Sequence, residues 1–303
     1  MYIQSIFMNL NKLLLFVFFA ATMFSCSKDD TTGTGNGTID AKIMNDVAYG
    51  TDPKQKMDIY LPANRSVTTT KVIILIHGGA WISGDKSEFS SAIIDTLKKR
   101  VPDYAIFNIN YRLAALPSTN VFPTQEHDVK AAVEFIFGNR SSYLVSSKFV
   151  LMGASAGGHL ALLQAYKHQS PVKIKAVVDF CGPTDMVAMY NDYAVSLPSQ
   201  LGLVALMSGT PATNPAMYQQ SSPITTAYAN AVNACPTIIF QGTADAIVNA
   251  ITQSEALRDK LTAATVVNEY HPYAGLGHVD TWAPATLTDA FNKIQVFLAA
   301  HVQ

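Results

Sequence analysis

Residues 148–166 read KFVLMGASAGGHLALLQAY and carry the strongest signal in this chain of 303 residues. An apolar run passes through GASAG (153–157) into a helical pattern. A serine between two glycines on a tight strand-to-helix turn is typical of a nucleophile elbow, where the backbone holds the hydroxyl above the end of a sheet. The N-terminus of the following helix favours negative charge that develops beside it. This context predicts Ser155 as a nucleophile; the alternative is a glycine-rich turn without chemistry.

Outside this turn, β-branched apolar runs alternate with helical patterns, which indicates an α/β fold with a mostly parallel sheet. We expect eight strands with helices on both faces and right-handed crossovers. The run KVIILI (71–76) is apolar throughout, as in a strand buried on both faces. The patterns predict strands at 43–49, 56–61, 71–76, 104–110, 148–152, 174–180, 237–240 and 265–270, and helices at 87–100, from Pro123, at 156–168, 251–262 and 288–300.

One irregular stretch, 182–234, interrupts this alternation and contains five prolines. An interruption of this length between two strands predicts a small cap or lid rather than a separate domain. Caps of this kind usually shape a substrate pocket. We therefore expect one domain over 39–303 that includes this insertion.

The N-terminal residues are expected to direct export and not to belong to the fold. An apolar run, LLLFVFFAATMF (13–24), follows Lys12 and is too short to span a bilayer comfortably. Ser25 and Cys26 follow it, in a pattern that resembles the lipobox of bacterial lipoproteins. This resemblance implies a signal peptide over 1–25, a lipid on Cys26, a flexible tether over 26–38 and anchoring at the outer membrane, on its periplasmic or cell-surface face. A chance cysteine after an ordinary signal peptide is the alternative.

Composition excludes several classes of function. A formal net charge of −1 gives no basic field that would attract nucleic acid. Three cysteines are too few for a disulfide framework. Cys181 and Cys235 are expected at opposite ends of neighbouring parallel strands, about 15 Å apart, so both should be reduced and buried. The sequence shows no clustered metal ligands, P-loop or dinucleotide motif, and we expect neither a metal nor a cofactor.

The candidate general base is His278, in the glycine-rich loop GLGH (275–278) after a predicted strand. Such a loop can carry an imidazole over the serine, and the order nucleophile, acid, histidine is that of α/β-hydrolases. His271 is the rival, but it lies at a strand end before Pro272. His301, in the terminal helix, is expected to be solvated.

The candidate acid is Asp245, on the turn QGTAD (241–245) that leaves a predicted strand. There its carboxylate can accept a hydrogen bond from the imidazole and hold its tautomer. Asp280 is close to His278 in sequence, but neighbouring loop residues seldom face one another. Asp185, at the entry to the insertion, is the other competitor.

The segment IHGGAW (76–81) follows the strand at 71–76 and predicts an oxyanion loop. Its glycines let backbone N–H groups approach a substrate oxygen closely. We expect the donors to be the N–H groups of Gly79, Gly78 and Ala156. His77 is expected to brace this loop rather than to act as a second base.

Other polar and aromatic residues are expected near the site. Arg112 and Asp128 are interpreted as a structural pair supporting the oxyanion loop, in preference to a substrate contact, because buried charges are retained when paired. Trp81, Tyr111 and Trp282 are candidates for the wall of the substrate pocket, although such aromatics are often simply core.

Together, MDIYLP (57–62), HGGAW (77–81), NYR (110–112), SAGGHLA (155–161) and GTAD (242–245) resemble the hormone-sensitive-lipase-like esterases, and within them the feruloyl/acetyl-xylan esterase and carboxylesterase branch. The similarity extends from about Val47 to the C-terminus. Ala154 and His159 depart from it, because hormone-sensitive lipases usually carry Asp and Asn there. The resemblance implies the α/β-hydrolase fold and a serine carboxylic-ester hydrolase, acting through an acyl-enzyme on short-chain or aromatic acyl esters of carbohydrates.

Three other functions fit parts of the pattern. An arylformamidase shares the oxyanion loop, and a peptidase of the prolyl-oligopeptidase type shares the triad, although no propeller is present in this sequence. A non-catalytic glycan-binding surface protein with the same fold is the third. A shared catalytic pattern specifies mechanism better than substrate.

Overall fold

The computed structural model describes residues 38–193, 196–225 and 228–303. The predicted signal peptide, Cys26 and all of the predicted tether except Thr38 lie outside these residues. Residues Thr38–Gln303 form one compact unit. Within the described ranges, the helices are too short or too polar to cross a bilayer.

An eight-stranded sheet runs through the middle of this unit in the order β1-β2-β4-β3-β5-β6-β7-β8. All neighbouring strands from β4 to β8 are parallel, and β2 is antiparallel to both of its neighbours. The predicted mostly parallel α/β sheet is thus confirmed. The strands are β1 (Lys42–Ala48), β2 (Lys56–Leu61), β3 (Lys71–Ile76), β4 (Tyr104–Ile109), β5 (Phe149–Ala154), β6 (Ala176–Phe180), β7 (Thr237–Gly242) and β8 (Asn268–Tyr273).

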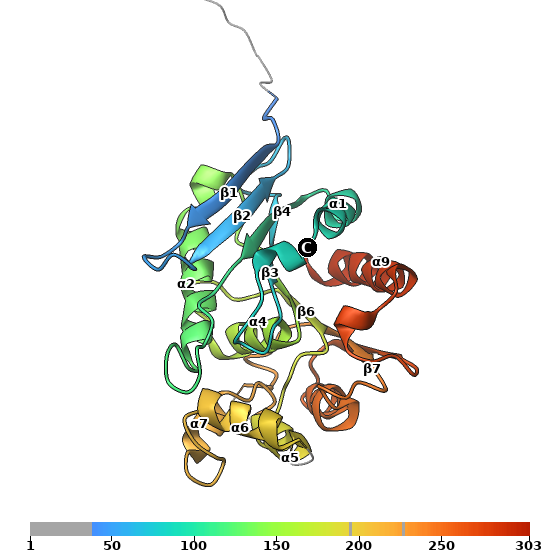
Figure 1. Cartoon of the computed structure of the whole chain (residues 1–303). Helices are drawn as coiled ribbons and strands as arrows, with labels where there is room; N and C mark the ends of the chain where they lie inside the picture. Colours follow the sequence, from blue (N-terminus) through green and yellow to red (C-terminus); the bar gives the residue numbers. More distant parts are fainter. Residues whose placement is uncertain (1–37, 194–195, 226–227) are drawn as a thin grey trace, which may run out of the picture. The chain divides into compact units, whose positions relative to one another are not determined.

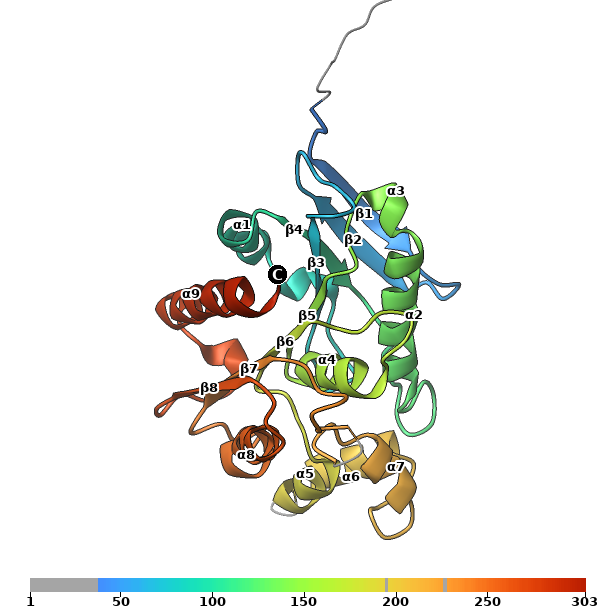
Figure 2. The ribbon, with the colours of Figure 1, turned by 180° about the vertical axis from the view of Figure 1, so that it is seen from behind.

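Helices cover both faces of the sheet (Figures 1 and 2). One face carries α2 (Thr124–Gly138), α4 (Ala156–Lys167) and α8 (Ala256–Ala263), and the other carries α1 (Ser91–Arg100) and α9 (Pro284–His301). The central strands are buried on both sides, which is why their sequences are apolar without alternation.

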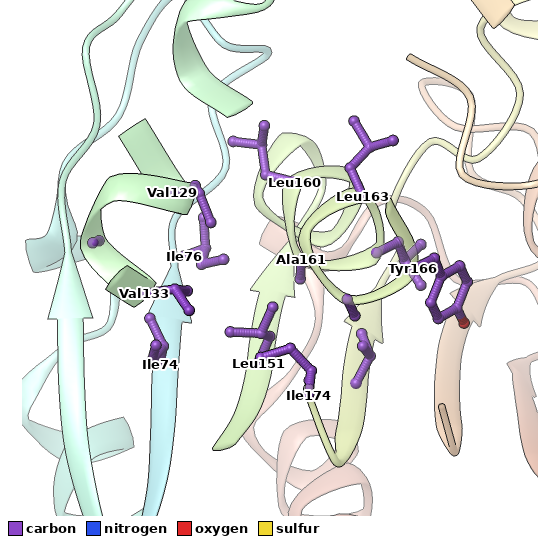
Figure 3. Packing of buried hydrophobic residues seen from close by; sticks show 14 of the residues in the cluster. Ile74, Ile76, Val129, Val133, Leu151, Leu160, Ala161, Leu163, Tyr166 and Ile174 are labelled. Atoms are coloured by element: carbon purple, nitrogen blue, oxygen red, sulfur yellow. The ribbon is translucent and has the colours of Figure 1, made fainter. Parts of the chain in front are cut away.

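Close packing between helices and strands fixes the central layer (Figure 3). Val129 and Val133 of α2 and Leu160 and Ala161 of α4 are fully buried against the strands, together with Leu151 of β5. Deleting a buried side chain of this kind down to alanine typically costs about 2–5 kcal/mol. The α4 helix that begins beside Ser155 is therefore rigidly held.

The strand order reverses between β3 and β5. From β3 the chain moves to β4 on one side, then crosses over and returns to β5 on the other. In open α/β sheets such a switch point leaves a crevice at the carboxyl ends of the strands, where ligands bind. The predicted oxyanion loop follows β3 and Ser155 follows β5, so the topology brings them together.

The insertion 182–234 consists of three short helices, α5 (Met186–Asp192), α6 (Leu197–Leu206) and α7 (Pro215–Gln220), as far as it is described. It packs against α4, because Ser221 O and Gln220 O accept hydrogen bonds from His159 and Lys167. No helical period was visible for these segments, because each helix is at most ten residues long.

Most predicted boundaries differ from the structure by one to four residues, and the C-terminal elements show the clearest differences. Strand β8 starts at Asn268 rather than at 265 and runs past Pro272, which an edge strand tolerates. Helix α9 starts at Pro284 rather than at 288, with proline in its first turn. The helix predicted at 251–262 is divided into a π-helical η3 (Ala250–Glu255) and α8.

Three short helical elements complete the fold. The 3-10 turn η1 (Lys86–Glu88) precedes α1, and the 3-10 turn η4 (Val279–Thr281) precedes α9. The short helix α3 (Arg140–Tyr143) follows α2.

Arg112 and Asp128 form a structural pair, as interpreted from the sequence. The Asp128 carboxylate is buried and accepts hydrogen bonds from Arg112 N, Nε and Nη2, with distances of 2.6–3.1 Å. Gln55 Nε2 donates a further bond of 2.7 Å. All of its oxygen lone pairs thus face donors within the protein, away from the substrate side.

Asp128→Ala should lower the free energy of unfolding by about 3 kcal/mol, because it leaves the Arg112 guanidinium without its buried partner. Urea unfolding measures this value. Asp95→Ala is a matched control: Asp95 pairs with Lys98 on the exposed side of α1, and its loss should change stability by less than about 0.5 kcal/mol. Equal effects of the two substitutions would contradict the structural role.

Candidate active site

Ser155 lies on a sharp turn between β5 and α4. Its backbone has φ +54° and ψ −122°. Residues other than glycine rarely adopt a conformation with positive φ. The turn is so tight that a Cβ on Gly153 would lie 2.2 Å from Gly157 O, so only glycine fits there. The predicted elbow geometry is therefore present.

Asp245 and His278 are brought together from segments 33 residues apart. His278 Nδ1 lies 2.7 Å from Asp245 Oδ2, and both side chains are buried. The other carboxylate oxygen accepts hydrogen bonds from the N–H groups of Ile247 and Val248, at 2.8 and 2.9 Å. Burial by itself would raise the pKa of Asp245, but the hydrogen bonds from His278 and these N–H groups outweigh it and hold the pKa below its ordinary value. An ionised carboxylate accepts a hydrogen bond from Nδ1–H, which keeps the proton on Nδ1 and leaves Nε2 as the basic nitrogen.

Gln241 and Ser254 hold this carboxylate in place, which the sequence analysis missed. Gln241 Nε2 donates to Asp245 Oδ2 at 3.1 Å, and Ser254 Oγ donates to Gln241 Oε1 at 2.7 Å. The sequence did carry a signal for this residue: Gln241 is a polar residue at the end of an otherwise apolar strand, directly after TIIF (237–240). The chain of bonds fixes the rotamer of the acid.

Ser155 and His278 both line a cavity of about 660 Å³. Among the described residues, neither the Ser155 hydroxyl nor His278 Nε2 has a hydrogen-bond partner. Both groups are thus free toward the cavity, where a reacting carbonyl would sit.

The loop after β3 follows the pattern expected of an oxyanion loop. Gly79, Ala80 and Trp81 all have positive φ, of 96°, 51° and 63°, a strain that persists only where the surroundings enforce it. Within the described residues, the N–H groups of Gly78, Gly79 and Ala156 have no recorded acceptor, and the two glycines line the cavity beside Ser155. These N–H groups are available for an anionic oxygen.

Trp81 and Tyr111 do not lie where the sequence analysis expected them. Both are almost fully buried and neither lines the cavity. Tyr111 Oη donates to His77 O and Gly78 O at 3.0 and 2.9 Å, and its ring stacks on His77. Trp81 Nε1 donates to His159 Nδ1 at 3.2 Å. Their polar tips anchor the strained loop, so they support it from below instead of facing the substrate.

Trp282, the third aromatic candidate, does line the cavity. Its Nε1 donates to Gly277 O at 2.9 Å, next to His278. It therefore forms part of the cavity wall and also restrains the loop that carries the imidazole.

The rival candidates are engaged elsewhere. His271 lies on β8 and pairs with Glu269, and Asp185 accepts from Val187 N and Ala188 N as the N-cap of α5. Asp280 lines the cavity but makes no hydrogen bond to His278.

The depth of the cavity comes from helices α1 and α9, a contribution that the sequence analysis missed. No described residue of the insertion 182–234 lines it. The cavity-lining positions of these helices have the spacing of any buried helix face, so the sequence carried no separate signal for them. The apolar lining of the cavity is formed by Phe89, Ile93, Met152, Phe180, Leu287 and Phe291.

Two buried histidines brace the site from below. Trp81 Nε1 can only donate, so His159 Nδ1 accepts, and its Nε2–H donates to Ser221 O at 2.7 Å. His159 is therefore neutral, and burial lowers its pKa to about 4. Burial likewise lowers the pKa of His77, which contacts Gly78 O through Nδ1 at 2.9 Å, to about 4.

These histidines should make the fold sensitive to acid. Between pH 6.5 and 4 the unfolded chain binds more protons than the folded chain at both histidines, so stability is lost as pH falls through this window. Asp179 acts in the opposite direction, since burial raises its pKa to about 7 and the folded chain gains stability as that carboxylate is protonated. The two histidines outweigh the one carboxylate, so the free energy of unfolding should fall by about 1.4 kcal/mol for each unit by which the pH falls in this window.

His159→Asn should flatten this pH dependence, because it removes one of the two histidines. Urea unfolding at several pH values between 6.5 and 4 measures the slope. His127→Asn, on the exposed surface of α2, is the control and should keep the slope of the unsubstituted chain. An unchanged slope in His159→Asn would contradict a neutral, buried His159.

Both described cysteines, Cys181 and Cys235, are free and buried, as expected. One group of potential metal ligands occurs within the described residues, and it combines Cys181 with Asp245 and His278.

The BD-FAE family model matches residues 57–261. Esterase LipC of Mycobacterium tuberculosis is 24% identical over 245 residues, 77% of this chain and 58% of that protein. The chain spans little more than half the length of the first curated relatives that it matches.

Solved structures are similar over most of this chain. The bifunctional GH43-CE protein of Bacteroides eggerthii matches with a TM-score of 0.68 at 28% identity, covering 85% of this chain and 38% of that one. A truncated carbohydrate esterase from gut microbiota matches with a TM-score of 0.67 at 24% identity, covering 86% of this chain and 95% of that one. These similarities confirm the predicted α/β-hydrolase fold.

Proposed function

The chain belongs to the BD-FAE family, and from this premise we propose that it is a serine ester hydrolase that releases short-chain or aromatic acyl groups from carbohydrate esters. The observation that carries the proposal is the Asp245–His278 hydrogen bond of 2.7 Å beside a cavity that Ser155 also lines. Relatives named esterase support the ester part, and a similar structure named carbohydrate esterase supports the carbohydrate part.

Acyl transfer proceeds through Ser155 in two steps. His278 Nε2 takes the hydroxyl proton as Oγ attacks the ester carbonyl, and Asp245 stabilises the imidazolium that forms. The same proton passes to the departing alcohol, which leaves an acyl-serine. Water, deprotonated by His278, then attacks the acyl carbon and restores the free serine.

The negative charge of each tetrahedral intermediate falls on the former carbonyl oxygen. The N–H groups of Gly78, Gly79 and Ala156 are the donors placed to receive it. One such donor is worth about 3 kcal/mol of barrier. These donors belong to the backbone and are held by Tyr111 and Trp81, so the loop is preorganised.

The acyl group occupies the apolar part of the cavity, between α1 and α9, and the sugar lies toward the opening. This assignment is supported by the apolar residues of the lining, among them Met152 and Phe180. A volume of about 660 Å³ exceeds what an acetyl group fills and leaves room for an aromatic acid.

Turnover of a substrate panel tests the proposal: acetylated xylan, feruloylated arabinoxylan and p-nitrophenyl esters of rising chain length. N-formylkynurenine and dipeptide naphthylamides complete it, because their turnover would indicate an arylformamidase or a peptidase. Hydrolysis of amide or formamide substrates without any ester hydrolysis would contradict the proposal.

Leu287→Trp should narrow the cavity on the side of α9 and shift preference toward shorter acyl groups. Because one methylene in an apolar pocket already changes kcat/KM by about 10-fold or more, the ratio of aromatic to acetyl ester turnover should fall at least about 10-fold. Val296→Trp adds the same side chain to the exposed face of α9 and should leave the ratio unchanged. An unchanged ratio in Leu287→Trp would place the acyl group elsewhere.

Export and lipidation of the chain at Cys26 form a separate proposal, carried by the sequence alone. Mass spectrometry of the mature protein from its native membrane should find an acylated Cys26 as the N-terminus. An unacylated N-terminus at another residue would contradict it.

A further inference from the structure

Cys181 lies beside the acid and base but has no part in the proposed reaction. It follows β6 directly, has a positive φ of 52° and is fully buried. Its N–H donates to Phe240 O at 2.9 Å, which ties it to the neighbouring strand β7. One ligand atom each of Cys181, Asp245 and His278 lies within 4.8 Å of the other two.

A sulfur, a nitrogen and a carboxylate oxygen form a donor set that suits a borderline-soft divalent cation such as Zn²⁺. Hard cations such as Mg²⁺ prefer oxygen ligands alone. The charges also match, because a complex of a divalent cation with a thiolate and a carboxylate has no net charge. Burying such a neutral complex costs less free energy than burying an unpaired ion.

The cluster adjoins the cavity on the side of His278. His278 lines the 660 Å³ cavity, which gives an ion a route to the cluster. A tetrahedral zinc ion needs its ligand atoms roughly 3.5 Å apart, so the 4.8 Å span has to contract by about 1.3 Å and the 2.7 Å between His278 Nδ1 and Asp245 Oδ2 has to widen.

We propose that Cys181, Asp245 and His278 form an inhibitory binding site for Zn²⁺ and similar thiophilic divalent cations. The inhibition, though not the binding, rests on the proposed function, because it uses Asp245 and His278 as the acid and base. The site is assembled from three separate segments, which is why no ligand motif is visible in the sequence.

Binding switches off the base through its tautomer. The thiol of Cys181 loses its proton to solvent as sulfur binds the ion. The ion takes the Nδ1 lone pair of His278, so the imidazole proton moves from Nδ1 to Nε2 by exchange with solvent. Nε2 is then an N–H donor and cannot accept the proton of Ser155, and the Asp245–His278 hydrogen bond is replaced by the ion.

The first test is inhibition of ester hydrolysis by Zn²⁺, normalised to the rate of each variant in EDTA. Zn²⁺ should inhibit the unsubstituted chain to saturation, and Mg²⁺ should not. Cys181→Ala should require at least about 100-fold more Zn²⁺ for half inhibition, since even residues outside the ligand sphere are worth 10–100-fold in affinity. Cys235→Ala removes the other buried free cysteine and should keep the sensitivity of the unsubstituted chain.

The second test measures binding without activity. Cd²⁺ added to Ser155→Ala, which keeps all three ligands, should produce the ultraviolet absorption of a cadmium–thiolate bond with one ion per chain. The double variant Ser155→Ala, Cys181→Ala should lose this band, and Ser155→Ala, Cys235→Ala should keep it.

Equal Zn²⁺ sensitivity of Cys181→Ala and the unsubstituted chain would overturn the proposal, as would a cadmium–thiolate band that survives the loss of Cys181. If no ester is hydrolysed, the cadmium titration still decides whether the site exists. Failure of the ion site and failure of the proposed function are thus distinguishable.

Discussion

Ser155→Ala should lower kcat for ester hydrolysis by about 10⁶-fold, which is the loss expected when the nucleophile of a serine triad is removed. The elbow, the oxyanion N–H groups and the cavity all remain in this variant. It should therefore bind substrate with little change and keep a residual rate above that of water, supplied by the oxyanion donors alone.

Steady-state kinetics on a p-nitrophenyl ester measures this effect, with urea unfolding to show that the fold is intact. Ser199→Ala, an exposed serine of α6, is the matched control and should retain full activity. Loss of less than about 100-fold in Ser155→Ala would mean that another group attacks the ester.

Asp245→Asn should lower kcat by about 10⁴-fold with nearly unchanged geometry. An amide at this position donates to His278 Nδ1 and favours the tautomer that carries the proton on Nε2, so the base is lost. The side chain remains held by the N–H groups of Ile247 and Val248, which donate to the other oxygen, while the bond from Gln241 Nε2 is lost.

Asp280→Asn separates this mechanism from a general effect of a negative charge near the cavity. Asp280 also lines the cavity but does not contact the imidazole, so its variant should retain most of its activity. A larger loss in Asp280→Asn than in Asp245→Asn would reassign the acid.

The positions of the proposed catalytic residues were predictable because each one follows a strand in a glycine-rich turn. Ser155, Asp245 and His278 all lie at the carboxyl edge of one sheet, and the alternation of apolar runs was enough to place those edges. Chain order then selected His278 over His271, which pairs with Glu269 on β8 and does not line the cavity.

The walls and supports of the site were not predictable in the same way. Leu287 and Phe291 line the cavity from α9, but their spacing is that of any buried helix face. Trp81 and Tyr111 were expected at the pocket because they follow strands, yet hydrogen bonds from their polar tips turn them beneath the oxyanion loop. Which side of a loop an aromatic ring takes depends on tertiary partners, and a single sequence does not carry that information.

The insertion 182–234 shows the same limit for larger elements. Its position between β6 and β7 followed from the prolines, but its three helices are too short for a periodic signal. The sequence analysis expected it to shape the pocket. Its described part packs instead against α4 through contacts such as His159 to Ser221, and the cavity is formed by the opposite helical layer.

Reaction with a fluorophosphonate, followed by mass spectrometry of the peptides, tests most directly whether Ser155 is activated by His278 and Asp245. We expect a single adduct, on Ser155. It should be absent from Ser155→Ala, and it should form much more slowly in His278→Ala. An adduct on another residue, or labelling that persists in Ser155→Ala, would contradict it.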